Sequence, residues 1–480
     1  MNPKKTPQIV VIGGGISGLA CATRLFQYER ERNFPIHLRL LESAPNPGGV
    51  ISTLHREDCL IEEGPDAIFT EKPWGLDFLK RLGLESKIIG TNPHLRKSFV
   101  FIEGKLRPVP EGFYLVGPSK IWPFITTSVF TWPGKLRALC DLWISKRESS
   151  GDESLASFVR RRLGQEILER MAQPMVAGIY SSDPEDLSLE ATFPQFLEME
   201  KKHGSLIKAF TQRNSGVGSL KAATGPRYSL FVSLKDGLGS LVKRIQEKLP
   251  PGMIQCGKKV NEIHLQEFPK KRFHIRGNNF EMEADCVCVA LPAPKSAGIL
   301  RSVDSGLSES LSRIPYHSGA TINLGYEQSD LPHPLKGFGF VVPEIEKRWM
   351  TGCTFSSVKF PGRSPQGREI LRAFVGGEKF KDFVDLPDPE ILSRVQSDLK
   401  DILGISANPL FSHVSRYPDS LPQYRVGHQN LVQAIEGQVR EIPGLALAGN
   451  AYRGVGIPDC IRSGEKAADQ IFKTCLERVF

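Results

Sequence analysis

The first forty residues combine two strand-like runs with one amphipathic stretch. Residues 9–12 are apolar and mostly β-branched, which is typical of a strand buried on both faces of a parallel sheet. Residues 17–28 follow with apolar side chains on one helical face, and residues 36–41 form a second strand-like run. The order strand, helix, strand predicts an α/β unit at the start of the chain.

Further along, the spacing of apolar positions predicts more helices and a second sheet. Helices are predicted over residues 73–82, 154–171 and 389–403. Strands are predicted over residues 98–110, with a turn at Glu103-Gly104, and over residues 321–326, 338–342, 350–355 and 371–375. The basic run Arg160-Arg161-Arg162 is interpreted as the solvated face of its helix.

Residues 113–143 have a different composition from the rest of the chain. They are rich in aromatic and apolar residues and are interrupted by Pro118, Pro123 and Pro133. Two interpretations stay open: broken helices packed in a core, or an exposed apolar surface that contacts a membrane or admits an apolar substrate.

The turn between the first strand and the first helix carries a chemical signal. It has glycine at positions 13, 15 and 18, and the second strand ends at Glu42. Glycines at this spacing let the backbone approach a pyrophosphate, and the helix N-terminus favours its negative charge. An acid at the end of the next strand can accept hydrogen bonds from ribose hydroxyls. The stretch therefore predicts a dinucleotide site.

Composition limits the remaining possibilities. A chain of 480 residues is expected to form two or three domains. Its formal net charge of +9 suits acidic substrates or an anionic membrane surface, and there is no basic run of nucleic-acid type. The nine cysteines include no C-x-x-C pair, so we expect no metal site and reduced thiols, as in a cytoplasmic protein. We expect neither a signal peptide nor a membrane-spanning segment.

Four later stretches point to one family. Residues 60–66 read L-I-E-E-G-P-D, shortly after Gly48-Gly49. Residues 173–193 read Q-P-M-V-A-G-I-Y-S-S-D-P-E-D-L-S-L-E-A-T-F, residues 193–206 F-P-Q-F-L-E-M-E-K-K-H-G-S-L, and residues 416–428 R-Y-P-D-S-L-P-Q-Y-R-V-G-H. With these motifs the chain resembles, nearly end to end, the FAD-dependent porphyrinogen oxidases of haem biosynthesis, a branch of the amine-oxidase-like flavoproteins.

The resemblance implies an α/β fold with a Rossmann-like FAD-binding domain, an antiparallel-sheet substrate domain and a helical insertion. Three segments of the chain would build the FAD-binding domain, at residues 1–90, 225–300 and 405–480. Residues 91–110 and 301–404 would form the substrate domain, and residues 111–224 the helical insertion, which could face a membrane.

The resemblance also implies the site residues and the reaction. FAD would be bound by Gly13, Gly14, Gly15, Ile16, Ser17, Gly18, Glu42, Ser43, Gly49, Gly64, Pro65, Asp66, Ala67, Val260, Tyr417, Gly449, Val455, Gly456 and Ile457. The substrate would contact Gly178, Ile179, Phe355 and Lys72. Because the flavin carries the redox step and dioxygen reoxidises it to give hydrogen peroxide, no catalytic side chain is expected.

Two porphyrinogens remain open as the substrate. Plant and mitochondrial protoporphyrinogen oxidases carry an arginine just before the strand that begins at Phe99, where this chain has Ser98. The resemblance therefore favours coproporphyrinogen III over protoporphyrinogen IX. A different flavoenzyme of the same fold, or a flavoprotein that only binds tetrapyrroles, is a remoter alternative. We expect a cytoplasmic protein, with peripheral membrane contact and hand-over of the product to the next haem-pathway enzyme both left open.

Overall fold

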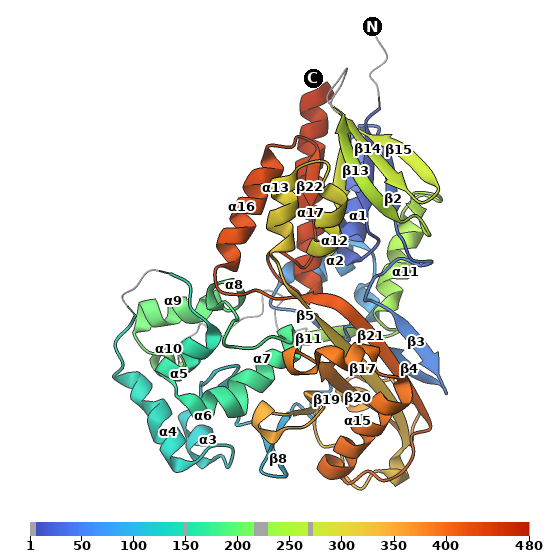
Figure 1. The fold of residues 1–480 in the computed structure, drawn as a ribbon. Coiled ribbons are helices and arrows are strands. Elements are labelled where there is room, and N and C mark those ends of the chain that lie inside the picture. The colour runs from blue at the N-terminus through green and yellow to red at the C-terminus, as the bar shows by residue number, and fades with distance from the viewer. Residues whose placement is uncertain (1–5, 148–150, 216–228, 267–271, 480) are drawn as a thin grey trace.

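The computed structural model describes residues 6–147, 151–215, 229–266 and 272–479 (Figure 1). Its upper part is built on a five-stranded parallel sheet with the order β12-β2-β1-β16-β22. The strands are β1 (Gln8–Ile12), β2 (His37–Leu41), β12 (Ile254–Gln255), β16 (Cys286–Val289) and β22 (Leu445–Leu447). Three distant parts of the chain therefore meet in one sheet.

Both faces of this sheet are buried, which explains the uncharged run at its centre. Ile9 and Val11 of β1 pack into one core, and Val10 and Ile12 pack into another on the opposite face. The first face is covered by α1 (Ile16–Arg32), α2 (Pro73–Arg81), α11 (Gly239–Lys248) and α17 (Ile457–Val479). The second is covered by α12 (Ala293–Leu300), α13 (Ser305–Ser312), α16 (His428–Arg440) and the strands β13 (Val260–Gln266), β14 (Arg272–Gly277) and β15 (Phe280–Ala284).

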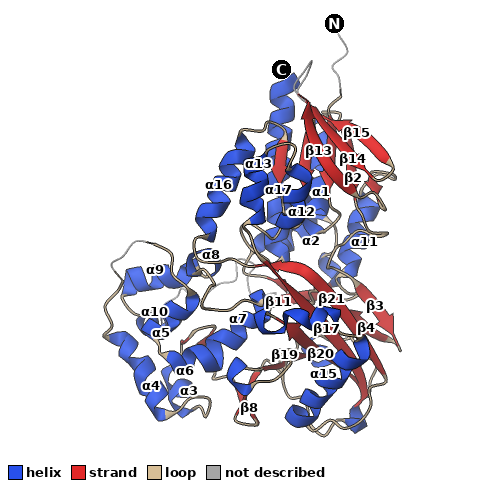
Figure 2. Ribbon diagram, in the orientation of Figure 1, coloured by secondary structure: helices blue, strands red, loops and turns tan. Residues whose placement is uncertain are grey.

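A seven-stranded sheet forms the lower right part of the molecule (Figure 2). Its order is β21-β17-β20-β19-β18-β7-β8, antiparallel except for the β18–β7 pair. The strands are β7 (Phe99–Ile102), β8 (Lys105–Pro108), β17 (Tyr316–Glu327), β18 (Gly339–Val341), β19 (Gly352–Phe355), β20 (Arg368–Gly376) and β21 (Phe411–Pro422). Helix α15 (Asp388–Leu403) packs against one face of the sheet through Ile391, Val395 and Leu399.

Strand β21 corrects one predicted domain boundary. Residues 405–480 were expected to belong entirely to the FAD-binding domain, but β21 pairs with β17 from Gly325↔Phe411 to Tyr316↔Pro422. Residues 411–422 are therefore part of the antiparallel sheet. These twelve residues form one strand, and its backbone N–H and C=O groups pair with the neighbouring strand β17. The last segment of the parallel-sheet domain therefore begins only after Pro422.

The lower left part of the molecule is a group of short helices around their own core (Figure 1). They are α3 (Ile121–Thr126), α4 (Trp132–Leu139), α5 (Leu155–Arg162), α6 (Gln165–Ile167), the π-helix η3 (Leu168–Ala172), α7 (Gln173–Tyr180), α8 (Leu189–Thr192), α9 (Pro194–His203) and α10 (Leu206–Ser215). The single helix predicted over residues 154–171 is wrong, because Gly164 takes a φ of +98° and ends α5. The predicted boundary at residues 224 and 225 lies outside the described residues.

Short elements connect these three parts. The small strands are β3 (Thr53–Arg56), β4 (Cys59–Glu62), β5 (Ile68–Phe69), β6 (Ile88–Gly90), β9 (Phe113–Tyr114), β10 (Gly117–Pro118) and β11 (Phe231–Leu234). The short helices are η1 (Glu85–Lys87), η2 (Cys140–Leu142), η4 (Gln328–Asp330), η5 (Glu344–Glu346), α14 (Ser356–Lys359) and η6 (Glu378–Asp385).

The basic run on α5 is not a uniformly solvated face, as had been predicted. Arg160 is exposed, but the Arg162 side chain is completely buried and donates from Nε to Asp141 Oδ1 at 2.6 Å. The other carboxylate oxygen of Asp141 accepts from the Ser205 hydroxyl and the Ile207 amide. Successive helical residues point about 100° apart, so three arginines in a row cannot all face solvent when the helix lies on a core.

In the aromatic segment at residues 113–143, some aromatic side chains pack in a core and others are exposed. Phe124 and Phe130 are buried in the helical core, whereas Trp122, Trp132 and Trp143 are 74%, 63% and 78% exposed. Within the described residues, no helix combines the length and the apolar character that crossing a membrane requires.

Candidate flavin site

The glycine turn after β1 forms the base of the predicted nucleotide cradle. Gly18 packs against the turn itself, since a Cβ at this position would lie 1.9 Å from the Gly13 carbonyl oxygen. Helix α1 begins at Ile16 with Gly15 as its N-cap, without a side-chain cap and without an acidic residue in its first turn. A Cβ at Gly15 would meet no atom within 4 Å. The helix N-terminus therefore presents its positive dipole end to open space, as phosphate binding requires.

Glu42 lies at the end of β2 beside this turn. Its carboxylate accepts from the Gly14 amide at 2.6 Å, the Ala44 amide at 2.7 Å and the Ser43 hydroxyl at 3.1 Å. An ionised carboxylate offers about four acceptor positions, so capacity remains for a ribose hydroxyl. The residue is only 9% exposed, and its backbone carbonyl accepts from the Lys258 amide, two residues before Val260. This places Val260 in the core next to the end of β2.

The E-G-P-D stretch contacts both the loop after the Gly49 turn and the antiparallel sheet. Gly64 lies so close to the Gly49 turn that a Cβ would stand 1.8 Å from the Val50 carbonyl oxygen. From the antiparallel sheet, the Thr321 hydroxyl donates to the Glu63 carbonyl and the Arg372 guanidinium to the Gly64 carbonyl. The stretch is therefore held from both domains.

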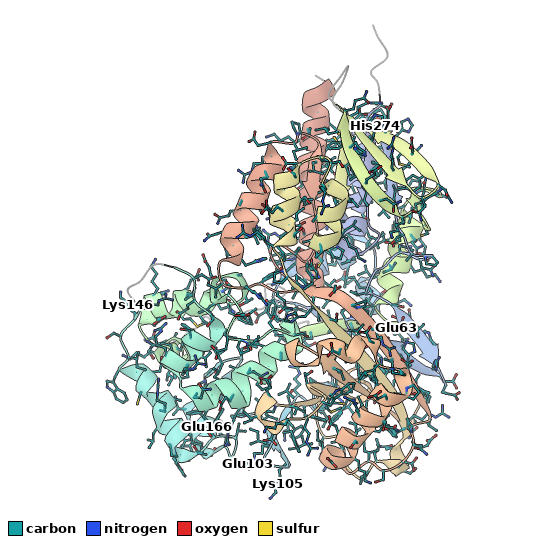
Figure 3. All side chains as sticks on the ribbon, in the orientation of Figure 1. Glu63, Glu103, Lys105, Lys146, Glu166 and His274 are labelled. Carbon is teal, nitrogen blue, oxygen red and sulfur yellow. The ribbon has the colours of Figure 1, made fainter. Side chains whose placement is uncertain are left out.

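Charged partners surround the same stretch. Although burial opposes ionisation, Lys359 and Arg372 hold the pKa of Asp66 below its ordinary value, with Lys359 Nζ 2.7 Å from Asp66 Oδ2. Burial likewise opposes ionisation of Glu63, but hydrogen bonds from Ser52, His413 and Ser415 lower its pKa. Figure 3 labels the position of Glu63 in the molecule. The predicted residues Pro65 and Ala67 flank Asp66 and are half-buried.

Tyr417 of β21 reaches the same place from the opposite sheet. Its hydroxyl lies 3.5 Å from the position that a Cβ on Gly64 would take, and burial raises its pKa to about 12. The structure thus brings Tyr417 together with Gly64, although about 350 residues separate them in sequence.

The loop before α17 is fixed by one buried tyrosine. The Gly454 amide donates to Tyr424 Oη at 2.7 Å, and Tyr424 Oη donates to the Asn450 carbonyl at 2.5 Å. The fully buried Tyr424 ring stacks on His428, with 4.0 Å between ring centroids. These contacts orient Val455 and Gly456, and α17 then begins at Ile457. At the start of the same loop, the Gly449 amide donates to Ser463 Oγ at 3.0 Å.

The end of α7 comes next to this loop. Ile179 is 46% exposed, and a Cβ at Gly178 would meet no atom within 4 Å. The neighbouring Tyr180 packs on Tyr424, with ring centroids 6.1 Å apart, and Val455 packs against the same helical core. Gly178 and Ile179 therefore offer open surface near the start of α17, where the sequence predicts the flavin ring.

Phe355 and Lys72, both predicted to contact the substrate, already pack against or pair with other residues of the chain. Phe355 is completely buried among the residues that pack under α15, with its ring against His333 and Phe340, so it offers no surface to a ligand. Lys72 Nζ forms an ion pair with Asp459 Oδ2 at 2.5 Å, in the first turn of α17. Lys72 therefore already has an anionic partner within the chain. Phe355 packs in the core because the side chains of β19 alternate between the two faces of the sheet.

Sequence reasoning missed Tyr424, Arg372 and Asp459. Tyr424 lies in the quoted stretch at residues 416–428, and Asp459 follows the predicted V-G-I segment, so both could have been suspected from position alone. Arg372 gives no local signal, because its partners Gly64 and Asp66 are about 300 residues away.

This arrangement defines a protein class. An open helix N-terminus, an acid beside it and a second helix N-terminus fit the phosphate, the ribose and the ring end of a flavin dinucleotide. The family model described as flavin containing amine oxidoreductase matches residues 16–472. The chain belongs to this family, and the α/β flavoprotein fold predicted from the sequence is confirmed.

Individual relatives narrow the comparison. The chain is 34% identical to the coproporphyrinogen III oxidase of Bacillus subtilis (strain 168), over 96% of each chain. It is 28% identical to the chloroplastic protoporphyrinogen oxidase of Nicotiana tabacum, over 98% of this chain and 86% of that protein. A solved structure of a protein from Exiguobacterium sp. 255-15 superposes with a TM-score of 0.85 at 31% identity, over 97% of this chain and 99% of that one.

Proposed function

We propose that this protein is an FAD-dependent porphyrinogen oxidase that converts coproporphyrinogen III to coproporphyrin III. The observation that carries the proposal is the near full-length similarity to coproporphyrinogen III oxidases from several bacteria. FAD, when bound, would supply hydride acceptance from the macrocycle, and dioxygen would reoxidise it with release of hydrogen peroxide.

The residues of this protein would bind FAD and the porphyrinogen and orient them relative to each other. The open N-terminus of α1 would hold the pyrophosphate, and Glu42 would accept from the ribose hydroxyls. Asp66, kept ionised by Lys359 and Arg372, would fix the E-G-P-D stretch across the two domains. Ile179 would present apolar surface to the pyrrole rings, and Gly178 would allow their close approach. Pyrrole N–H protons can leave to water, so no buried base is needed.

The choice between the two porphyrinogens rests on carboxylates. Coproporphyrinogen carries four propionates, whereas protoporphyrinogen carries two propionates and two vinyl groups. Burying an unpaired carboxylate costs several kcal/mol, so a closed apolar pocket would reject the four-carboxylate ring. Ser98 is exposed just before β7 and supplies no cation for a propionate. By contrast, a pocket that is partly open to water would accept all four carboxylates and would favour coproporphyrinogen III.

Side-by-side kinetics under matched oxygen test this proposal. We expect a higher kcat/KM with coproporphyrinogen III than with protoporphyrinogen IX, and Ser98→Arg should narrow the gap by improving the two-propionate substrate. Lys97→Arg is the control, because it introduces an arginine at the adjacent position without changing the net charge of the protein. A clear preference of the wild type for protoporphyrinogen IX would overturn the substrate assignment. No hydrogen peroxide with either substrate would overturn the oxidase assignment itself.

We also propose peripheral membrane contact through the exposed tryptophans of α3, α4 and the turn after them. Trp122, Trp132 and Trp143 are joined there by Leu136, which is 61% exposed. Tryptophan is suited to the interface because one part of the ring system is apolar and the N–H stays hydrated. Co-sedimentation with vesicles of anionic lipid should be reduced by Trp122→Ser/Trp132→Ser. Complete recovery in the supernatant at low and high salt would contradict contact.

A further inference from the structure

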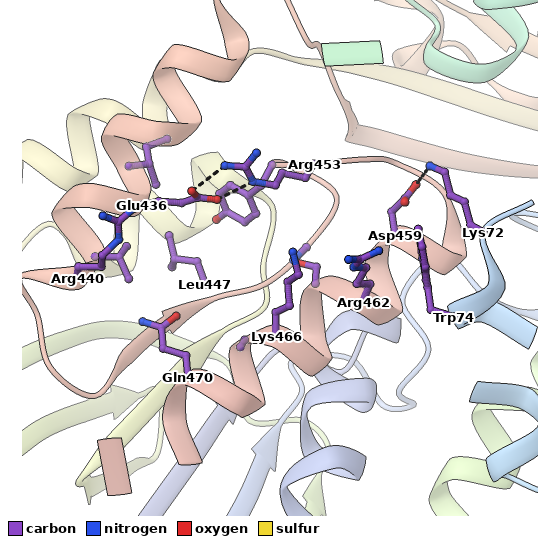
Figure 4. A pocket seen from close by; sticks show the side chains of 16 residues that line it. Lys72, Trp74, Glu436, Arg440, Leu447, Arg453, Asp459, Arg462, Lys466 and Gln470 are labelled. Atoms are coloured by element: carbon purple, nitrogen blue, oxygen red, sulfur yellow. Dashed lines mark hydrogen bonds and ion pairs between the residues drawn. The ribbon is translucent and has the colours of Figure 1, made fainter. Parts of the chain in front are cut away.

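A cavity of about 510 Å³ lies between α16, the edge strand β22 and α17, and it is closed at one end by Lys72 and Trp74 (Figure 4). Such a volume is in the range of small-molecule sites. Among the residues expected to bind the flavin dinucleotide, only Gly449 lines it, and none of the lining residues comes from the glycine turn or from Glu42. It is therefore distinct from the nucleotide cradle.

The rim of this cavity is strongly basic. Five cations and two carboxylates line it: Lys72, Arg440, Arg453, Arg462, Lys466, Glu436 and Asp459. Both carboxylates are already paired. Arg453 donates to Glu436 through two hydrogen bonds of 2.8 and 2.7 Å, and Lys72 holds Asp459.

Three cations are left over. In the part of the chain that the structure describes, no carboxylate forms an ion pair with Arg440, Arg462 or Lys466, and all three are exposed. Arg440 projects from α16, whereas Arg462 and Lys466 lie one turn apart on α17, so the surplus charge faces the cavity from two sides (Figure 4). The Arg462 guanidinium lies 4.2 Å from the centroid of the Trp74 ring.

The floor between these cations is apolar. Leu447 of β22 and Trp74 of α2 are half-buried and offer apolar surface to the cavity, and Ile435, Val439 and Ala467 also line it. A ligand that matches this lining needs an apolar body and at least two anionic groups far enough apart to reach both helices. A simple inorganic anion would satisfy the rim but leave the floor uncovered.

We propose that this cavity is a second ligand site, which binds an organic anion with an apolar body and two or more carboxylates or phosphates. Carboxylates on a tetrapyrrole and phosphates on a nucleotide are two sources of the same chemistry. Arginine and lysine bind both groups through charge-assisted hydrogen bonds. Apart from Lys72, which is paired with Asp459, no residue expected to contact the porphyrinogen lines the cavity, so its occupant would be a product or an effector.

Calorimetric titration of the FAD-loaded protein tests this proposal, with coproporphyrin III and ADP as separate probes. We expect Arg440→Gln/Lys466→Gln to weaken the binding of at least one probe about tenfold, which corresponds to about 0.7 kcal/mol for each of two exposed ion pairs, within their usual range. The control Lys243→Gln/Lys400→Gln removes the same charge from exposed positions on α11 and α15 and should leave binding unchanged.

The outcomes separate this inference from the proposed function. An effect on coproporphyrin III alone would assign a carboxylate ligand, and an effect on ADP alone a phosphate ligand. The double variant should keep the wild-type kcat/KM for the porphyrinogen, because neither residue belongs to the flavin site. Binding that is absent for both probes, or equal in the double variant and the wild type, would overturn the second site. Variant-dependent binding in a protein without porphyrinogen oxidation would leave the site standing and refute the oxidase.

Discussion

Two buried tyrosines near the start of α17 allow one substitution to be tested against a matched control. The Tyr424 hydroxyl has two hydrogen-bond partners, the Gly454 amide and the Asn450 carbonyl. Tyr452 is only 8% exposed, and its hydroxyl has no hydrogen-bond partner among the described residues. Replacement by phenylalanine removes the same atom from both sites, but it breaks bonds only at Tyr424.

The magnitude follows from these contacts. A buried hydrogen bond contributes about 1 kcal/mol net, and a polar group left buried without its partner costs about 1–3 kcal/mol. Tyr424→Phe breaks two bonds and strands one N–H and one carbonyl, so we expect a loss of about 2–3 kcal/mol. Tyr452→Phe removes an unpaired hydroxyl, so stability should stay within about 1 kcal/mol of the wild type and shift, if at all, upwards.

Thermal unfolding with and without added FAD measures both effects. Because Tyr424 orients the loop that leads to Val455 and Gly456, Tyr424→Phe should also reduce the stabilisation that FAD provides, and Tyr452→Phe should not. If both substitutions change the unfolding temperature equally, the two hydrogen bonds of the Tyr424 hydroxyl do not contribute to stability. An unchanged response of Tyr424→Phe to FAD would refute the role assigned to the loop.

Three further predictions concern the cofactor, the helical core and pH. Glu42→Ala should weaken FAD binding by about 1–3 kcal/mol through lost charged hydrogen bonds, measured by release of FAD on dilution; release of FMN instead would contradict the dinucleotide site. Arg162→Ala should cost about 3–5 kcal/mol of stability because it leaves Asp141 buried without its partner, whereas Arg160→Ala at the exposed end should change stability by less than about 1 kcal/mol. Burial lowers the pKa of His428 to about 4, below its ordinary 6.5, so the unfolded chain takes up the proton first on acidification. Stability should therefore be highest above pH 6.5 and fall by up to about 3 kcal/mol as the pH drops to about 4, and denaturation at several pH values should show a smaller fall for His428→Gln.

The strand, glycine turn and acid of the predicted nucleotide cradle could be predicted from sequence because their determinants are local. The apolar strand, the glycines and the acid all lie between residues 9 and 42, and hydrogen bonds within that stretch complete the turn. Most of the antiparallel strands were also predictable individually, since each carries its own pattern of apolar positions, but β21 was not predicted as a strand. Their partners were not, and the assignment of residues 411–422 to the wrong domain follows from that limit.

Position on a helix or strand decided which of the other predicted residues are exposed and which are buried. Ile179 is exposed at the end of α7, but Phe355 is buried in the core under α15, although the family resemblance implied a substrate contact for both. Arg162 is buried and Arg160 is exposed within one run of identical residues. In each case the packing of a distant element decides which face is buried, and the residue type alone does not.

The sequence by itself determined the α/β order, the dinucleotide turn and the family resemblance, because these depend on neighbouring residues and on motif spacing. Only the tertiary structure placed Arg372 on Gly64, Tyr424 on the loop before α17 and Lys72 on Asp459. It also assembled the basic cavity from α16, α17 and the start of α2. Such contacts join side chains hundreds of residues apart, and no local pattern encodes them, because they form only when packing of the apolar faces brings the elements together.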